Sequence, residues 1–199
     1  MDFHLYNLFY LAYYVMNNHE IKIIKLNYSD FPNGKVVVPG YSSDKYYDLS
    51  LTESHGRWDI SFELKDFDKT FTKSHPVQIF EDYKLDQECY IAEVNGAEAG
   101  IISFSLQEWN NTMRIWDMYI YDDNMKRKGI GTSLMNIAKK RAKEIKARAI
   151  ILETQTSNYS AIEFYRKNGF ELIGFDKLCY SNKDVESREV RIEMGFIVK

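Results

Sequence analysis

Cysteine, histidine, proline and glycine are all scarce in this chain of 199 residues. The two cysteines, Cys89 and Cys179, form no CxxC pair and provide no disulfide framework, which favours a reducing, cytoplasmic location. The four histidines include no pair at i,i+4 spacing, so we expect no metal site. Three prolines and ten glycines are too few for long flexible linkers, and no break in composition separates two domains.

Long apolar runs are also missing. Residues 3–16 are very apolar, but they lack a basic flank, a cleavage site and the roughly 20 residues that a membrane span needs. We therefore expect no membrane span and interpret residues 1–20 as a helical extension that packs on the domain or on a second subunit. A helix on a membrane surface is the alternative, which the absence of Lys and Arg before Lys22 disfavours.

The net charge of −3 conceals an uneven distribution. Residues 126–148 contain nine basic residues and one acidic residue, a net +8, whereas the rest of the chain carries 17 basic and 28 acidic residues, a net −11. Proteins that bind nucleic acid usually spread positive charge over a whole face, so we expect no nucleic-acid partner. One concentrated basic segment suits a single small polyanion instead.

The first half of the chain reads as strands and turns. Residues 21–28 predict a strand, and two alternating apolar runs around a His-Gly turn predict a β-hairpin over residues 45–65. Ser74 resembles a helix N-cap, so the spacing that follows predicts a short helix ending near Tyr83.

The second half alternates more regularly between strands and helices. The predicted strands are residues 88–94, 98–106, 112–121, 149–155, 170–181 and 189–198, and the predicted helices start near Gly129 and span 158–167. This βββαβαββ order predicts a mixed α/β (α+β) fold.

A basic, glycine-containing loop joins one of these strands to the next helix. It reads Lys126-Arg127-Lys128-Gly129-Ile130-Gly131-Thr132. The first turn of a helix presents backbone N–H groups without intrahelical partners, and glycine lets a bulky anion approach them. The loop therefore predicts a phosphate or pyrophosphate site. Its spacing matches neither the P-loop nor the dinucleotide fingerprint, and a glycine turn with a solvated basic face is the alternative.

A second motif lies on the strand and helix that follow. It comprises Leu152-Glu153-Thr154-Gln155-Thr156-Ser157-Asn158, then Phe164-Tyr165, then Asn168-Gly169-Phe170. Together with the basic loop, it resembles the GNAT superfamily of N-acetyltransferases over about residues 85–199, and it looks most like the streptothricin acetyltransferase branch. The resemblance implies a GNAT fold, in which helices flank a mixed, mostly antiparallel central sheet. It also implies acetyl-CoA as co-substrate, with no metal.

The same resemblance implies a set of cofactor-binding residues. The loop would hold the pyrophosphate, the preceding strand would pair with the pantetheine arm through its backbone, and an asparagine would bond that arm or cap its helix. These residues are Arg127, Lys128, Gly129, Ile130, Gly131, Thr132, Tyr119, Ile120, Tyr121 and Asn158. Lys126 stands where the family has Gln or Arg, and it keeps a positive charge at that position.

Two residues are candidates for catalysis. The resemblance implies that Tyr165 protonates the departing CoA thiolate, which suits a phenol with a pKa of about 10 and a thiol with a pKa of about 8.5. A buried core aromatic is the alternative for Tyr165. Glu153 could accept the proton of the substrate ammonium, hold that cation, or bond only to neighbouring backbone.

Taken together, these features predict an enzyme that transfers an acetyl group from acetyl-CoA to a primary amine, in a small molecule such as a streptothricin-like antibiotic or another cationic amine. A protein or peptide N-acetyltransferase and a non-catalytic acetyl-CoA-binding module are the alternatives. We expect a single domain over residues 21–199, with the cofactor-binding core at about 85–199 and a variable acceptor-side region at 29–84. A homodimer is left open.

Overall fold

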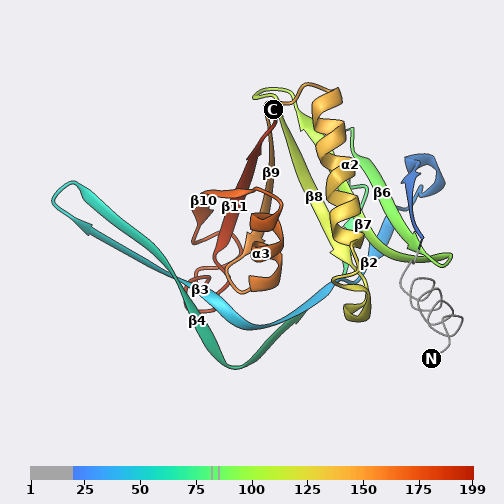
Figure 1. Cartoon of the computed structure of the whole chain (residues 1–199). Coiled ribbons are helices and arrows are strands. Elements are labelled where there is room, and N and C mark those ends of the chain that lie inside the picture. Colours follow the sequence, from blue (N-terminus) through green and yellow to red (C-terminus); the bar gives the residue numbers. More distant parts are fainter. Residues whose placement is uncertain (1–19, 82, 85) are drawn as a thin grey trace, which may run out of the picture.

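The computed structural model describes residues 20–81, 83–84 and 86–199, and its centre is a seven-stranded sheet (Figure 1). The strand order is β1-β6-β7-β8-β9-β11-β10, and all neighbours are antiparallel except β8 and β9. The strands are β1 (Ile21–Leu26), β6 (Glu88–Val94), β7 (Ala97–Gln107), β8 (Thr112–Ile120), β9 (Ala149–Gln155), β10 (Glu171–Asp176) and β11 (Arg191–Ile197). The mixed, mostly antiparallel sheet is confirmed. Apart from Glu20, the extension predicted for residues 1–20 lies outside the described residues.

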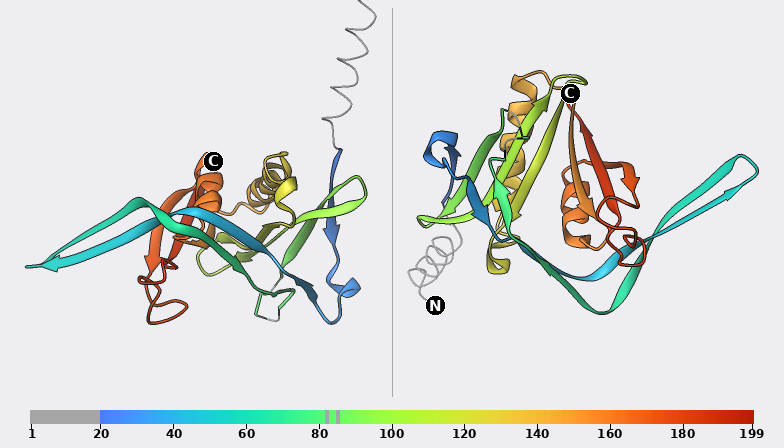
Figure 2. Two further views of the ribbon diagram at one scale, coloured as in Figure 1. Left: turned by 90° about the horizontal axis from the view of Figure 1, so that it is seen from below. Right: turned by 180° about the vertical axis from the view of Figure 1, so that it is seen from behind.

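Two helices, α2 (Ile130–Glu144) and α3 (Tyr159–Lys167), pack their apolar sides into a common core on one face of this sheet (Figures 1 and 2). The buried residues of α2 recur at helical spacing and are Ile130, Leu134, Met135, Ala138 and Ala142. Both helices begin where the sequence predicts them. Their burial against the sheet, rather than intrinsic propensity, supplies most of their stability.

A smaller apolar cluster covers the other face of the sheet. It comprises Val37, Ile79, Phe80, Cys89, Ile91 and Ile101. Part of this cover is a two-stranded sheet of β2 (Lys35–Val37) and β5 (Val77–Ile79).

The short helix predicted after Ser74 is wrong, because β5 occupies that segment. Pro76 disfavours a helical conformation at the residue before it. Phe80 has a positive φ of 61°, which a right-handed helix does not allow. The apolar residues Val77 and Ile79 are two apart, so their spacing also fits a strand. The pairing with β2 decides between the two readings, and it involves residues more than 35 positions away in the sequence.

The predicted hairpin exists but is longer than expected. It consists of β3 (Gly40–Ser54) and β4 (Arg57–Ser74), which we call the β3–β4 arm. The arm passes the end of α3 and projects beyond β10 (Figures 1 and 2). Where it passes α3, the Tyr47 backbone N–H donates to the Thr156 carbonyl at 3.0 Å.

The cations of α2 from Lys139 onward lie too far along the helix to reach a ligand at its start, which predicts a solvated basic face. This side of α2 is in fact only partly solvated. Lys139 Nζ donates to the Asn168 carbonyl at 2.6 Å, at the end of α3, and lies 4.6 Å from the centre of the Phe196 ring. Arg141 Nε donates to Glu88 Oε1 at 2.5 Å. These contacts fasten α2 to the sheet and to α3.

We expect Lys139→Met to destabilise the protein by about 1–2 kcal/mol. The change removes a hydrogen bond to a helix-terminal carbonyl and a cation–π contact, but it keeps the apolar stem. Denaturant unfolding measures the loss. Lys140→Met is the matched control, because the Lys140 side chain is 75% exposed on the same helix. Equal unfolding midpoints for the two variants would show that Lys139 contributes nothing.

Candidate active site

The two halves of the main sheet separate between β8 and β9. These parallel strands pair only at their beginnings, where Thr112–Arg114 face Ala149–Ile151. Beyond Arg114 no ladder pair joins them, and their ribbons diverge (Figure 1). In the described part of the chain, this side of β8 therefore has backbone N–H and C=O groups that no strand uses. An extended, peptide-like molecule can bind such an edge as an added strand.

A β-bulge at Trp116 accompanies this separation. Ser103 pairs with Asp117 and Phe104 pairs with Ile115, which leaves Trp116 without a partner on β7. A bulge bends its strand and increases the local twist, so β8 turns away from the line of β9. The extra residue thus contributes to opening the edge.

The backbone of Ile120 faces this opening. The Tyr121 N–H donates to the Ala99 carbonyl of β7 at 3.1 Å, so Tyr121 and Tyr119 direct their backbone groups toward β7. Because these directions alternate along a strand, the backbone groups of Ile120 and Met118 point the opposite way. Ile120 was predicted from the sequence. Met118 was not, although the alternation along the strand would have indicated it.

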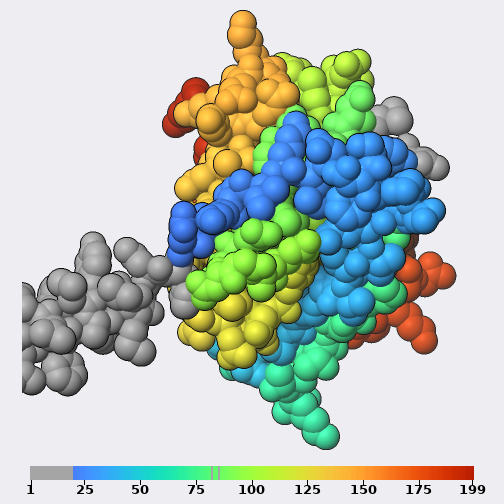
Figure 3. All heavy atoms as spheres, turned by 90° about the vertical axis from the view of Figure 1, so that its right-hand side faces the viewer, coloured from blue at the N-terminus to red at the C-terminus, as the bar shows by residue number. Residues whose placement is uncertain are grey.

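The basic loop leads into α2 with a backbone geometry that suits an anion. Arg127 and Gly129 have positive φ values of 63° and 85°, and Gly129 is the N-cap of α2 without a side-chain cap bond. Successive N–H groups in such a turn create a concave site for an anion. A Cβ at Gly131 would lie 3.2 Å from the Phe164 ring, so this glycine lets α2 and α3 approach closely. Figure 3 shows part of the segment around the loop (yellow) at the surface, on the side that carries β1.

Two cations of the loop have a neighbouring side chain close to their ammonium group. Lys126 Nζ lies 2.5 Å from Asp123, which offsets part of its charge. Lys128 Nζ lies 4.0 Å from the Met125 sulfur. Since the loop carries three cations and Asp123 neutralises one, it keeps a positive balance for a polyanion.

Tyr165 is buried on α3 with an exposed fraction of 7%. Its ring contacts those of Phe164 and Phe170, with centroids 5.6 Å and 6.1 Å away. Burial raises the pKa of Tyr165 to about 12, so the phenol keeps its proton throughout the neutral range. Its hydroxyl has no hydrogen bond from any described residue, which leaves it available to a ligand.

Tyr119 connects β8 electrostatically to the two catalytic candidates. Burial is the main cause that raises the pKa of Tyr119, and the charges of Asp117, Tyr165 and Glu153 add to it. Tyr119 of β8 therefore lies within electrostatic range of Glu153 on β9 and Tyr165 on α3. Tyr121 lies further along, and its hydroxyl is buried without a hydrogen bond from the described residues.

Glu153 is held by two arginines. Arg114 Nη2 donates to Glu153 Oε2 at 2.5 Å, and Arg191 Nη1 lies 3.6 Å from the same oxygen. Both arginines contact the same oxygen of Glu153, and a carboxylate engaged in this way suits a positioning role better than proton acceptance. Arg114 in turn lies 5.0 Å from the centre of the Trp116 ring.

Asn158 caps α3. Its side-chain oxygen accepts a hydrogen bond from the Ala161 N–H at 3.3 Å. This is the capping alternative that the sequence left open, and the amide nitrogen of the same side chain is still able to donate to a ligand.

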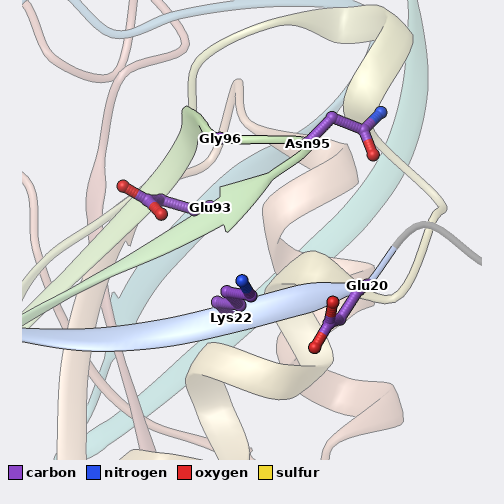
Figure 4. Close-up of a pocket in the computed structure, with 5 residues that line it drawn as sticks. All are labelled: Glu20, Lys22, Glu93, Asn95 and Gly96. Atoms are coloured by element: carbon purple, nitrogen blue, oxygen red, sulfur yellow. The ribbon is translucent and has the colours of Figure 1, made fainter.

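A hollow of about 190 Å³ lies at the β1 edge of the sheet, and none of the predicted site residues lines it (Figure 4). It is lined by Glu20, Lys22, Glu93, Asn95 and Gly96. Two carboxylates make it a poor phosphate site. In the described residues, no group of three His, Cys, Asp or Glu could hold a metal ion, and no helix there has the length and apolarity to cross a bilayer.

Comparisons with known proteins agree with this geometry. The model of the Acetyltransferase (GNAT) family matches residues 57–170. Streptothricin acetyltransferase A of Bacillus subtilis strain 168 is 30% identical over 81% of this chain and 90% of its own length. A streptothricin acetyltransferase of Escherichia coli is 33% identical over 55% of this chain and 62% of its own.

Two solved structures share the fold over most of the chain. One is a protein of Bacillus anthracis str. Ames, described as a streptothricin acetyltransferase and bound to acetyl coenzyme A. It has a TM-score of 0.71 and 29% identity, and the match covers 89% of this chain and 99% of that one. The other is a nourseothricin acetyltransferase with a TM-score of 0.74 and 22% identity, covering 90% and 99% of the two chains.

Proposed function

Because the chain belongs to the acetyltransferase (GNAT) family and is an acetyl-CoA-dependent N-acetyltransferase, we propose that its acceptor is a primary amine of a small cationic molecule, with streptothricin as the first candidate. The observation that carries this proposal is the similarity to a streptothricin acetyltransferase over nearly that relative's whole length. The net −11 of the chain outside residues 126–148 suits a cationic acceptor as well.

The site fits acetyl-CoA, which supplies an activated thioester. The N–H groups at the start of α2, with Arg127 and Lys128, bind the pyrophosphate. The backbone of Met118 and Ile120 pairs with the pantetheine arm along the open edge of β8. The amide nitrogen of Asn158 donates to the same arm while its oxygen caps α3.

In the proposed reaction, a neutral amine attacks the thioester carbonyl directly. A C–N bond forms, the C–S bond breaks, and the backbone N–H of Ile120 stabilises the negative charge that develops on the carbonyl oxygen. Tyr165 gives its proton to the thiolate sulfur, and the extra proton of the amine passes to solvent, from which the Tyr165 phenolate regains a proton before the next turnover. Burial raises the pKa of Tyr165, and the same dry surroundings raise the proton affinity of the thiolate that is released there, so the two groups stay closer in acidity than the Tyr165 value alone suggests.

Glu153 acts as a positioning residue in this proposal. Its contact with Arg114 places that guanidinium against Trp116, on the side of β8 from which the acceptor approaches. Proton acceptance by Glu153, one of the roles that the sequence leaves open, is the alternative.

The release of free CoA from acetyl-CoA tests the function. We expect rapid release with streptothricin, slower release with spermidine, and none above background with peptides that carry a free N-terminus or a lysine. Preferential turnover of peptides would favour a protein acetyltransferase. A rise in melting temperature with CoA, without turnover of any amine, would favour a binding module.

A further inference from the structure

The segment that follows β5 places an exposed aromatic side chain beside the bulge of β8. Tyr83 is 64% exposed, and its ring meets Trp116 edge to face with centroids 5.9 Å apart. Trp116 is fixed by its indole N–H, which donates to Ser105 Oγ at 2.9 Å, and by the Arg114 guanidinium. Trp116 thus links the Tyr83 ring to Arg114, which contacts Glu153 of β9.

A buried ion pair holds this segment in place. Lys84 Nζ and Asp117 Oδ2 lie 3.0 Å apart, and their side chains are 4% and 3% exposed. Asp117 also accepts a hydrogen bond from Ser103 Oγ at 2.5 Å. Burying two charges is costly, so a pair at this position fixes the geometry between Lys84 and β8 more than it adds stability. Since Tyr83 directly precedes Lys84, the ion pair also restrains the position of Tyr83 next to β8.

The chemistry around Tyr83 favours a cation. Its hydroxyl donates to Glu81 Oε2 at 2.6 Å, and Lys84 contacts the same oxygen, so Glu81 keeps Oε1 for a further donor. Burial, followed by the charges of Glu81, Asp117 and Glu153, raises the pKa of Tyr83 to about 12. Lys84 Nζ lies 5.7 Å from the centre of the Tyr83 ring, so the ring already has a cation nearby. The exposed remainder of the ring and Glu81 Oε1 are groups of the kind that bind ammonium ions.

We propose that Tyr83 is a specificity-determining residue, which together with Glu81 binds a second cationic group of the acceptor while its reactive amine lies at the opening between β8 and β9. This inference rests on the proposed function and narrows it: the acceptor carries at least two amino or guanidino groups. Lys84 is a positioning residue that acts through Tyr83.

Steady-state release of CoA with streptothricin tests the proposal. For Tyr83→Ala we expect the KM for streptothricin to rise about tenfold, with kcat and the KM for acetyl-CoA changed less than twofold. Tyr83→Phe keeps the ring and should raise the KM less than threefold. Trp109→Ala is the matched control, since Trp109 is 85% exposed beyond the other end of β8. Equal melting temperatures verify that the variants fold.

A second measurement addresses the extra cationic group. In the wild type, spermidine should inhibit the acetylation of streptothricin more strongly than butylamine does, and Tyr83→Ala should remove most of that difference. An unchanged KM for streptothricin in Tyr83→Ala, or equal increases of both KM values, would overturn the inference while leaving the acetyltransferase function intact. If the wild type acetylates another amine but not streptothricin, that amine replaces it in the assay. If the wild type releases no CoA with any amine, the proposed function fails and this inference fails with it.

Discussion

Replacing Tyr165 with Phe is expected to lower kcat at least 100-fold while leaving the KM for acetyl-CoA nearly unchanged. The substitution removes only the hydroxyl that would protonate the thiolate, and positioned acids contribute about 10²–10⁴-fold to a rate. The buried ring stays against Phe164 and Phe170. Since the hydroxyl has no hydrogen bond from the described residues, its loss should cost little stability.

The pH dependence sharpens this test. Burial keeps Tyr165 protonated up to a pKa of about 12, so its deprotonation should not limit kcat of the wild type at pH 7–10. Tyr159→Phe, on the same helix, is the matched control and should retain kcat. A Tyr165→Phe enzyme with wild-type kcat at several pH values would remove Tyr165 from the mechanism, and water would then have to protonate the thiolate.

Replacing Lys84 with Met is expected to lower the free energy of unfolding by about 3–5 kcal/mol. The variant leaves Asp117 charged and buried without its cation, which is the costly way to break a buried pair. Adding Asp117→Asn should restore part of the loss, because a neutral amide needs no cation and can still bond to Ser103. Unfolding in guanidinium chloride measures all three proteins.

An exposed ion pair provides the comparison. Lys45 Nζ lies 2.6 Å from Asp66, closer than Lys84 lies to Asp117, but both side chains are largely solvated. We expect Lys45→Met to leave the unfolding midpoint unchanged, because solvent screens surface pairs. If Lys84→Met were as stable as Lys45→Met, the segment around Tyr83 would not be held by this ion pair, and another contact would have to position its ring.

Local patterns in the sequence predicted most of the second half of the fold. The strands from β6 to β9 and both helices depend on alternation, helical spacing and turns such as Asn95-Gly96, whose φ values of 54° and 80° match a tight hairpin. The first half was less predictable. β5 is a strand because it pairs with β2, and no pattern within residues 74–83 contains that information.

The site shows the same division. The glycine turn at the start of α2 could be predicted because glycines and cations lie next to each other in the sequence. The environment of Glu153 could not, since Arg114 and Arg191 come from two other strands. For the same reason Lys139 and Arg141 looked solvated, although each has a partner far away in the chain. The role proposed for Tyr83 could not be predicted from the sequence, because its contact with Trp116 forms only when the segment after β5 packs against β8.

The short contact between β8 and β9 divides the sheet into two parts that are joined only where these two strands begin. Among the described residues, three residue pairs connect the strands β1-β6-β7-β8 to the strands β9-β11-β10. The angle between these two parts of the sheet must therefore be set mainly by the packing of the helices. An extended co-substrate bound along β8 would occupy the space between β8 and β9. Because this co-substrate would contact both parts of the sheet, we expect its binding to stabilise their relative position and to raise the melting temperature of the whole domain.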